Sequence, residues 1–103
     1  MINDNRLELH KKLVEILGSN NVYFQPPSTI KMNYPAIVYS RDDIDSTHAD
    51  NIVYKQFVRY QIILIDKSPT SKYIDAILQL PMCSYERGYQ ADNLNHDAFI
   101  IYV

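Results

Sequence analysis

The chain has 103 residues, the size of one domain, and its 47% hydrophobic and 21% charged residues are typical of a globular protein. Its formal net charge of -2 does not provide the broad basic surface that non-specific nucleic-acid binding usually needs. The single cysteine, Cys83, excludes a disulfide within the chain, and neither a signal peptide nor a membrane-spanning apolar run is expected. We therefore expect one domain over residues 1–103.

The N-terminal segment is predicted to form an amphipathic helix over residues 4–17, because apolar residues recur on one face at helical spacing. These residues are Leu9, Leu13, Ile16 and Leu17. The polar residues 3–5 (Asn-Asp-Asn) can cap the start of this helix. Gly18 is typical of a helix C-terminus, so the helix is expected to end there.

Two short strands are predicted next. Residues 22–25 favour a strand, and the prolines at 26–27 end it, since proline cannot donate a hydrogen bond to a sheet. A loop over 28–34 and a clear strand over 36–40 follow. The polar stretch over 41–51 is either a solvated hairpin loop or a continuation of that strand.

The strongest strand signal covers residues 53–65, where side chains alternate between two faces. One face carries Tyr54, Gln56, Val58, Tyr60, Ile62 and Leu64. The other face, which begins at Lys55 and ends at Ile65, changes from polar to apolar along the strand. Such a change is expected when only one end is covered on that side, so the outer half is predicted to project as a β-hairpin with the preceding strand.

A second helix is predicted to open at residues 68–69 (Ser-Pro), with serine as cap and proline in the first turn, and to end at Pro81. Its apolar stripe consists of Tyr73, Ile74, Ile77 and Leu78. Strands over 83–90 and 98–103 follow, separated by a turn over 91–95. The element order α-β-β-β-α-β-β predicts an α+β fold: a mostly antiparallel sheet with two packed helices and a projecting β-hairpin.

Histidines and carboxylates gather in two polar segments that could bind zinc or manganese if the fold brought them together. The first segment holds Asp42, Asp43, Asp45, His48 and Asp50, and the second holds Asp92, His96 and Asp97. Their spacing matches neither a helical pair of metal-binding histidines nor a calcium-binding loop. We therefore expect solvated loops with local turn hydrogen bonds, and no metal.

Two catalytic arrangements can also be drawn. Asp66, Lys67 and Glu86 could hold magnesium for phosphodiester hydrolysis, as in a nuclease, and Cys83 could act as a nucleophile with His96 as its base. A lone carboxylate motif without context does not support the first, and an apolar setting favours a structural thiol over the second. Glycine occurs only twice, which excludes a glycine-rich phosphate loop. We therefore expect that the protein is not an enzyme, and that it has no catalytic residue and binds no cofactor.

Tyrosine and charged side chains on the predicted strands and hairpin instead suggest contacts with other subunits. Nine tyrosines are present, and tyrosine is enriched at protein interfaces. The predicted interface residues are Arg41, Asp43, Tyr54, Arg59, Tyr85, Arg87 and Tyr89. A ring needs two different patches on each subunit, and we assign them to the hairpin over 41–54 and the segment over 83–95.

Several stretches of the chain resemble a family of small proteins from tailed bacteriophages and prophages. They are LGSNNVYFQPP (17–27), MNYPAIVY (32–39), ADN (49–51), VRYQIILIDKSP (58–69) and LPMCSYERGYQADNLNHDAFIIYV (80–103). The likeness covers most of the chain and rests on patterned strings, not on a catalytic signature. Members of the family look like siphovirus-type tail terminators, tail-completion or minor capsid proteins of the head–tail junction.

The resemblance implies an α+β subunit that forms a homo-oligomeric ring, with a hexamer expected. Such a ring caps the tail tube and joins it to the head-closure or neck protein, with possible passage of DNA through its lumen. The expected location is the virion, after assembly in the host cytoplasm, without membrane contact. The alternatives are a head-closure adaptor that binds the connector, a metal-dependent hydrolase, and a host-interaction module made early in infection.

Overall fold

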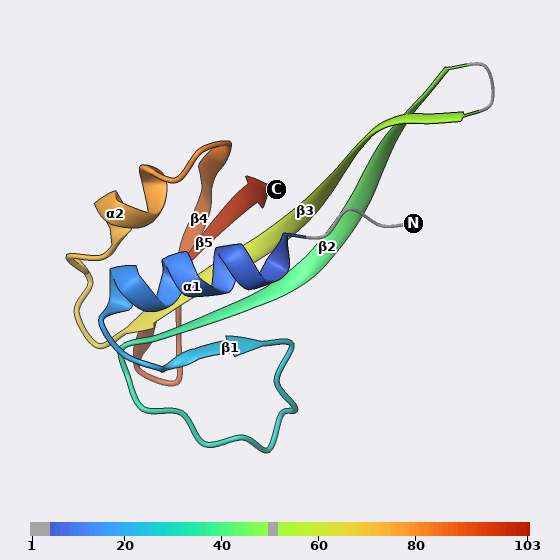
Figure 1. Cartoon of the computed structure of the whole chain (residues 1–103). Coiled ribbons are helices and arrows are strands. Elements are labelled where there is room, and N and C mark those ends of the chain that lie inside the picture. Colours follow the sequence, from blue (N-terminus) through green and yellow to red (C-terminus); the bar gives the residue numbers. More distant parts are fainter. Residues whose placement is uncertain (1–4, 50–51) are drawn as a thin grey trace.

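The computed structural model describes residues 5–49 and 52–103, and it describes side chains for residues 5–44 and 58–103. The elements are α1 (Arg6–Leu17), β1 (Val22–Phe24), β2 (Ala36–Ala49), β3 (Ile52–Asp66), α2 (Ile74–Leu78), β4 (Cys83–Ala91) and β5 (Leu94–Tyr102). Two helices and a five-stranded mixed sheet confirm the predicted α+β class (Figure 1). The sheet is mostly antiparallel, because only β1 and β2 pair in parallel.

α1 is an amphipathic helix whose apolar stripe faces the sheet. The buried members of this stripe are Leu9, Leu13 and Leu17. The helix begins at Arg6, and the predicted start at Asp4 lies outside the described residues. It ends at the predicted position, because Gly18 has a left-handed φ of 74° and its N–H donates to the Val14 carbonyl at 2.8 Å.

The strands lie in the order β1-β2-β3-β5-β4, so β3 and β5 are central and β4 is an edge strand. Val38 of β2 lies opposite Ile63 of β3, and Ile63 lies opposite Ala98 of β5. Residues directly opposite one another point to the same face, and successive residues point to opposite faces. This register therefore assigns each side chain to one of the two faces of the sheet.

The hydrophobic core lies on one face of the sheet. Its fully buried members on β3 are Val58, Tyr60, Ile62 and Leu64, which confirms this part of the predicted apolar face. They pack with Phe99 of β5, with the buried leucines of α1 and with Ile77 of α2. Both helices therefore cover the same face of the sheet (Figure 1).

A polar contact inside this core ties α1 to β2. Tyr39 is fully buried, and its hydroxyl lies 2.7 Å from His10 Nδ1 and accepts a hydrogen bond from Arg6 Nη1 at 3.3 Å. The Arg6 guanidinium also lies 4.5 Å from the centroid of the Phe24 ring. These partners satisfy the one polar atom that the Tyr39 side chain carries into the core.

The second helix is shorter than predicted, and the cap predicted at residues 68–69 is wrong, because α2 begins only at Ile74. Ser68 belongs to a turn in which its N–H donates to Asp66 Oδ1 at 3.2 Å and its hydroxyl accepts from the Thr70 N–H at 3.3 Å. A serine side chain that closes a turn in this way competes with helix initiation. Neither of the described helices is long and apolar enough to cross a membrane.

β4 and β5 form a tighter hairpin than predicted. Asp92 and Asn93 have φ values of 53° and 62°, and left-handed residues of this kind suit a two-residue turn between antiparallel strands. The predicted turn over 91–95 is therefore too long, and β5 starts at Leu94, before its predicted start at residue 98.

β2 continues through the polar stretch as far as Ala49, so the hairpin-loop alternative for residues 41–49 is wrong. β5 ends beside Val58, where Val103 exchanges two backbone hydrogen bonds with it. Beyond this level β2 and β3 pair only with each other in the described part of the chain. We call residues 42–49 and 52–58 the β2–β3 extension, and Figure 1 shows these two strand segments running away from the helices in a molecule of 51 × 27 × 23 Å.

Candidate subunit interface

The face of the sheet opposite the helices, which we call the helix-free face, carries the residues that alternate with the core. Its half-buried members include Val38, Ser40, Arg59, Gln61, Ile63, Ile100 and Tyr102. Sheets with one solvated face usually carry mainly polar residues there. Here Val38, Ile63 and Ile100 are half-buried aliphatic side chains, and Ala36, Ile65 and Ala98 on the same face are buried. Charged residues flank them on β2, β3 and β4.

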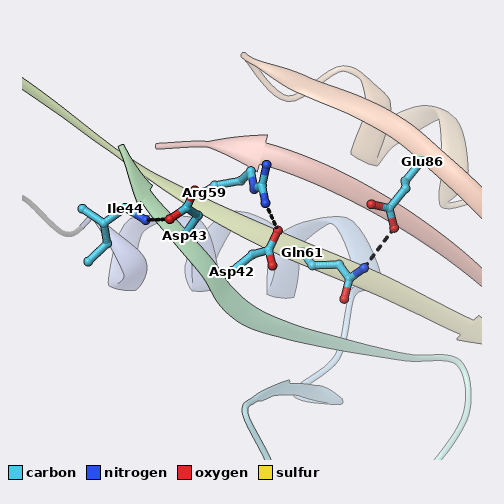
Figure 2. A network of polar contacts seen from close by, with 6 residues as sticks. All are labelled: Asp42, Asp43, Ile44, Arg59, Gln61 and Glu86. Atoms are coloured by element: carbon cyan, nitrogen blue, oxygen red, sulfur yellow. Dashed lines mark hydrogen bonds and ion pairs between the residues drawn. The ribbon is translucent and has the colours of Figure 1, made fainter. Parts of the chain in front are cut away.

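Arg59 joins β2 and β3 at the base of the extension (Figure 2). Its Nη2 lies 2.7 Å from Asp42 Oδ2. Asp42 reaches this position because it is the extra residue of a β-bulge, between Arg41 opposite Tyr60 and Asp43 opposite Arg59. The bulge therefore places two aspartates beside one arginine.

The environment of Arg59 favours its charged form. The pKa of Arg59 is raised, first by a hydrogen bond with Tyr102 and further by the charge of Asp42, while partial desolvation opposes the shift. Its side chain is 35% exposed, yet its Nε atom is buried and has no hydrogen-bond partner among the described residues. Arg59 thus places a positive charge between β2 and β3, and its Nε–H group is a hydrogen-bond donor without an acceptor among the described residues.

A second polar contact crosses β5. Gln61 Nε2 of β3 donates to Glu86 Oε1 of β4 at 2.9 Å (Figure 2). Glu86 is the extra residue of a bulge in β4, because Tyr85 and Arg87 lie opposite consecutive residues of β5. The bulge turns both Glu86 and Arg87 toward the helix-free face.

Two opposite charges remain without an ion-pair partner among the described side chains. Asp43 accepts the backbone N–H of Ile44 at 2.8 Å through Oδ1 (Figure 2). The Arg87 guanidinium lies 5.2 Å from the centroid of the Tyr89 ring, which stacks on His96 at 4.8 Å. β3 and β5 lie between Asp43 and Arg87, so the two charges do not meet within one chain.

Tyr85 lies on the side of β4 that faces the helices, and the residue is 46% exposed. Its hydroxyl donates to Asp97 Oδ1 at 2.8 Å, and its ring meets Phe99 edge-on with centroids 5.5 Å apart. Gly88 makes room for this arrangement, because a Cβ at that position would lie 2.6 Å from the Tyr85 hydroxyl oxygen.

We expect Gly88→Ala to lower the pKa of Tyr85. In the native chain this pKa is raised, first by the hydrogen bond to Asp97 and then by burial and the charge of Asp97. Because the folded-state pKa exceeds that of the unfolded chain, the contact stabilises the fold below about pH 10 and is lost as pH rises through the folded-state pKa. NMR titration of the Tyr85 ring carbon bearing the hydroxyl measures the shift. Ser84→Ala, on the other face of β4, should leave it unchanged, and an unchanged value in Gly88→Ala would contradict the prediction.

The residues predicted for the interface fall into two groups that one chain does not bring together. Arg41, Asp43 and Arg59 lie at the base of the β2–β3 extension, and Tyr85, Arg87 and Tyr89 lie on β4. The side chain of Tyr54 lies outside the described residues. Sequence reasoning missed Asp42 and Gln61 for this surface, since a bulge and a contact across β5 bring them to it.

The two polar segments considered for a metal remain apart. Asp43 lies at the level of Tyr102, where β5 ends, whereas Asp92 lies in the turn before β5 begins. The side chains of Asp45, His48 and Asp50 lie outside the described residues. Within the described side chains, no group of three or more His, Cys, Asp or Glu could hold a metal ion.

The catalytic arrangements are not assembled either. Asp66 lies opposite Asn95, whereas Glu86 lies near the level of Ala98, roughly 10 Å further along the strand at 3.3 Å per residue. Cys83 lies opposite Ile101, and His96 lies opposite Tyr89, so these positions are about 17 Å apart by the same rise. His96 therefore cannot act as a base for the Cys83 thiol.

We expect the Cys83 thiol to react slowly with a disulfide reagent at pH 8. Burial raises its pKa, which leaves less of the reactive thiolate and also restricts access. A Met82→Cys, Cys83→Ser variant is the matched control, because Met82 is 66% exposed on the neighbouring position. The control should react several-fold faster, and unfolding should remove the difference. Equal rates in the folded state would show that Cys83 is accessible.

No protein-family model and no curated protein matches the chain.

Proposed function

We propose that the protein is a structural component of a tailed bacteriophage virion, a tail terminator that assembles into a homo-oligomeric ring. The observation that carries this proposal is the pair of patches at opposite edges of one sheet. One patch lies at the base of the β2–β3 extension and the other on β4. A ring needs this arrangement, because each subunit must present two different surfaces to its two neighbours.

The composition of both patches supports contact with protein. Tyr85 and Tyr89 are 46% and 39% exposed, and Arg87 lies between them on the same strand. Tyrosine and arginine are enriched in interfaces, because they combine a large contact area with polar groups. Arg41, Asp43 and Arg59 give the other patch charges of both signs. In this proposal the β2–β3 extension is a hairpin that projects from the body and reaches the next subunit.

In this structural role no side chain of the protein takes part in a chemical reaction. The ring caps the tail tube and joins it to the head-closure or neck protein, so its partners are the tail tube protein, the neck protein and copies of itself. DNA passes through the lumen, and a formal charge of -2 per subunit avoids a strongly basic wall that would hold it. The protein is assembled in the host cytoplasm and is retained in the virion.

Mass measurement and electron microscopy of the purified protein, alone and with isolated tail tubes, test the proposal. We expect discrete rings, with six subunits, at the ends of the tubes. Binding to filled heads but not to tubes would favour the head-closure adaptor. A protein that stays monomeric and binds neither would contradict the proposal. Phosphodiester hydrolysis with magnesium or manganese that is lost in Asp66→Ala would establish the hydrolase.

A further inference from the structure

The sheet has two outer edges that carry unpaired backbone in the described part of the chain. β4 is the last strand on one side, so none of its nine residues borders a further described strand on the outer edge, and its side chains are exposed from Ser84 to Gln90. On the other side β1 pairs with β2 only from Ile37 to Tyr39. The outer edge of β2 is therefore open from Ser40 onward. Open strand edges are templates for pairing with another chain.

Side chains meet the outward backbone donors of β2 beyond β1. The Arg41 N–H donates to Gln25 Oε1 at 3.1 Å, and the Ile44 N–H donates to Asp43 Oδ1 at 2.8 Å. Both acceptors belong to exposed side chains. They can be exchanged for the carbonyl oxygens of an incoming strand, and the exchange at Ile44 would release the Asp43 carboxylate.

Strand direction determines how the two edges can meet. β2 runs antiparallel to β3, β3 to β5, and β5 to β4, so β2 and β4 point in opposite directions. When a second copy continues the sheet with its helices on the same side, its β2 lies antiparallel to β4 of the first. Antiparallel strands are the more common pairing.

One register of this pairing matches the side chains on both faces. Asp43 and Arg87 both belong to the helix-free face, since they lie opposite Arg59 and Ala98. When these two charges face each other across the copies, the bulge at Glu86 places Ile44 opposite Tyr85. Ile44 and Tyr85 are exposed apolar side chains, and both point to the face that carries the helices.

Building on the proposed ring, we infer that the first half of β4, from Cys83 to Arg87, pairs antiparallel with β2 of the next copy beyond Arg41, with Arg87 opposite Asp43 and Tyr85 opposite Ile44. The rest of β4 diverges from this edge, because β1 covers β2 from Ile37 to Tyr39. The contact is head-to-tail, because it uses a different edge of each copy. It joins the two unpaired charges and covers two exposed apolar side chains in a single register. It also leaves one open edge at each end of any chain of copies until a ring closes.

A disulfide across the two copies tests the register. In a Cys83→Ser background, Ile44→Cys combined with Tyr85→Cys should give a ladder of linked copies on a non-reducing gel after mild oxidation. The matched control is Ile30→Cys with Tyr85→Cys, since Ile30 is also exposed but lies outside the strands. The control should remain monomeric on the gel. Equal linking in both variants, or none in the first, would overturn the register.

Charge exchange tests the same contact without new cysteines. Asp43→Arg and Arg87→Asp should each weaken assembly on the order of tenfold or more, because each places like charges opposite each other. An equimolar mixture of the two variants should assemble, since every interface then joins residue 43 of one variant to residue 87 of the other. Lys11→Asp, on the exposed side of α1, is the control and should assemble normally.

The outcomes separate this inference from the proposed function. Rings that form without linking, and that tolerate both reversals, would overturn the edge pairing and retain the ring. A linked ladder that grows without closing would retain the edge pairing and overturn the ring. Linking at residues 44 and 85 within closed rings, with rescue by the mixture, supports both.

Discussion

Charge reversal at Arg59 is expected to weaken ring assembly strongly. Arg59→Glu would replace the partner of Asp42 with a third carboxylate, next to Asp42 and Asp43 at the base of the β2–β3 extension. Three neighbouring carboxylates repel one another, and this repulsion would force β2 and β3 apart where the extension leaves the sheet. We expect the concentration for half-maximal assembly to rise on the order of a hundredfold, as measured by sedimentation velocity.

Lys67→Glu is the matched control for this experiment. Lys67 is exposed just beyond the other end of β3, and its reversal changes the net charge by the same amount. It should assemble at the native concentration. Arg59→Lys keeps the charge but loses the forked geometry, so its assembly should lie between those of Arg59→Glu and the native chain. If Arg59→Glu assembled at the native concentration, the base of the β2–β3 extension would not be part of the interface.

Truncation of Leu13 is expected to cause a large loss of unfolding free energy. Leu13 is fully buried between α1 and the sheet, so Leu13→Ala leaves a cavity in the core. A change of this kind costs about 2–5 kcal/mol of unfolding free energy. For a domain of this size that corresponds to a fall in melting temperature of roughly 10–20 °C. Urea and thermal unfolding followed by circular dichroism measure both quantities.

Leu7→Ala makes the same chemical change on the same helix. Leu7 is 66% exposed, so its truncation should change the unfolding free energy by less than about 0.5 kcal/mol. The comparison separates loss of core packing from loss of helix propensity, which is equal in the two variants. Similar losses at both positions would mean that α1 does not pack on the sheet as described.

Elements with a strong repeating pattern could be predicted from the sequence. The leucines of α1 recur at helical spacing and are followed by Gly18, so both the helix and its end were apparent. The alternation from Val58 to Leu64 indicated which face of β3 is buried, and burial confirms it. These features depend on contacts within a few residues, which the sequence displays directly.

Elements that depend on local competition were predicted less well. The Ser-Pro pair at 68–69 has the residues of a helix start, yet Ser68 bonds within a turn and α2 begins only at Ile74. The Asp-Asn turn before β5 looked like part of a longer loop, because left-handed φ values at both residues are not visible in composition. In both places the same residues are compatible with several local conformations, and tertiary packing determines which one forms.

Local sequence patterns were enough to predict the α+β class, the core face of β3, and strands rich in tyrosine and in charges of both signs. Which of these side chains share a surface depends on the three-dimensional arrangement of the strands. Gln61 meets Glu86 across β5, and Asp42 reaches Arg59 through a bulge, because strand order and register set those distances and not separation along the chain. For the same reason Asp43 and Arg87 lie at opposite edges of one sheet, where they can meet only in different copies.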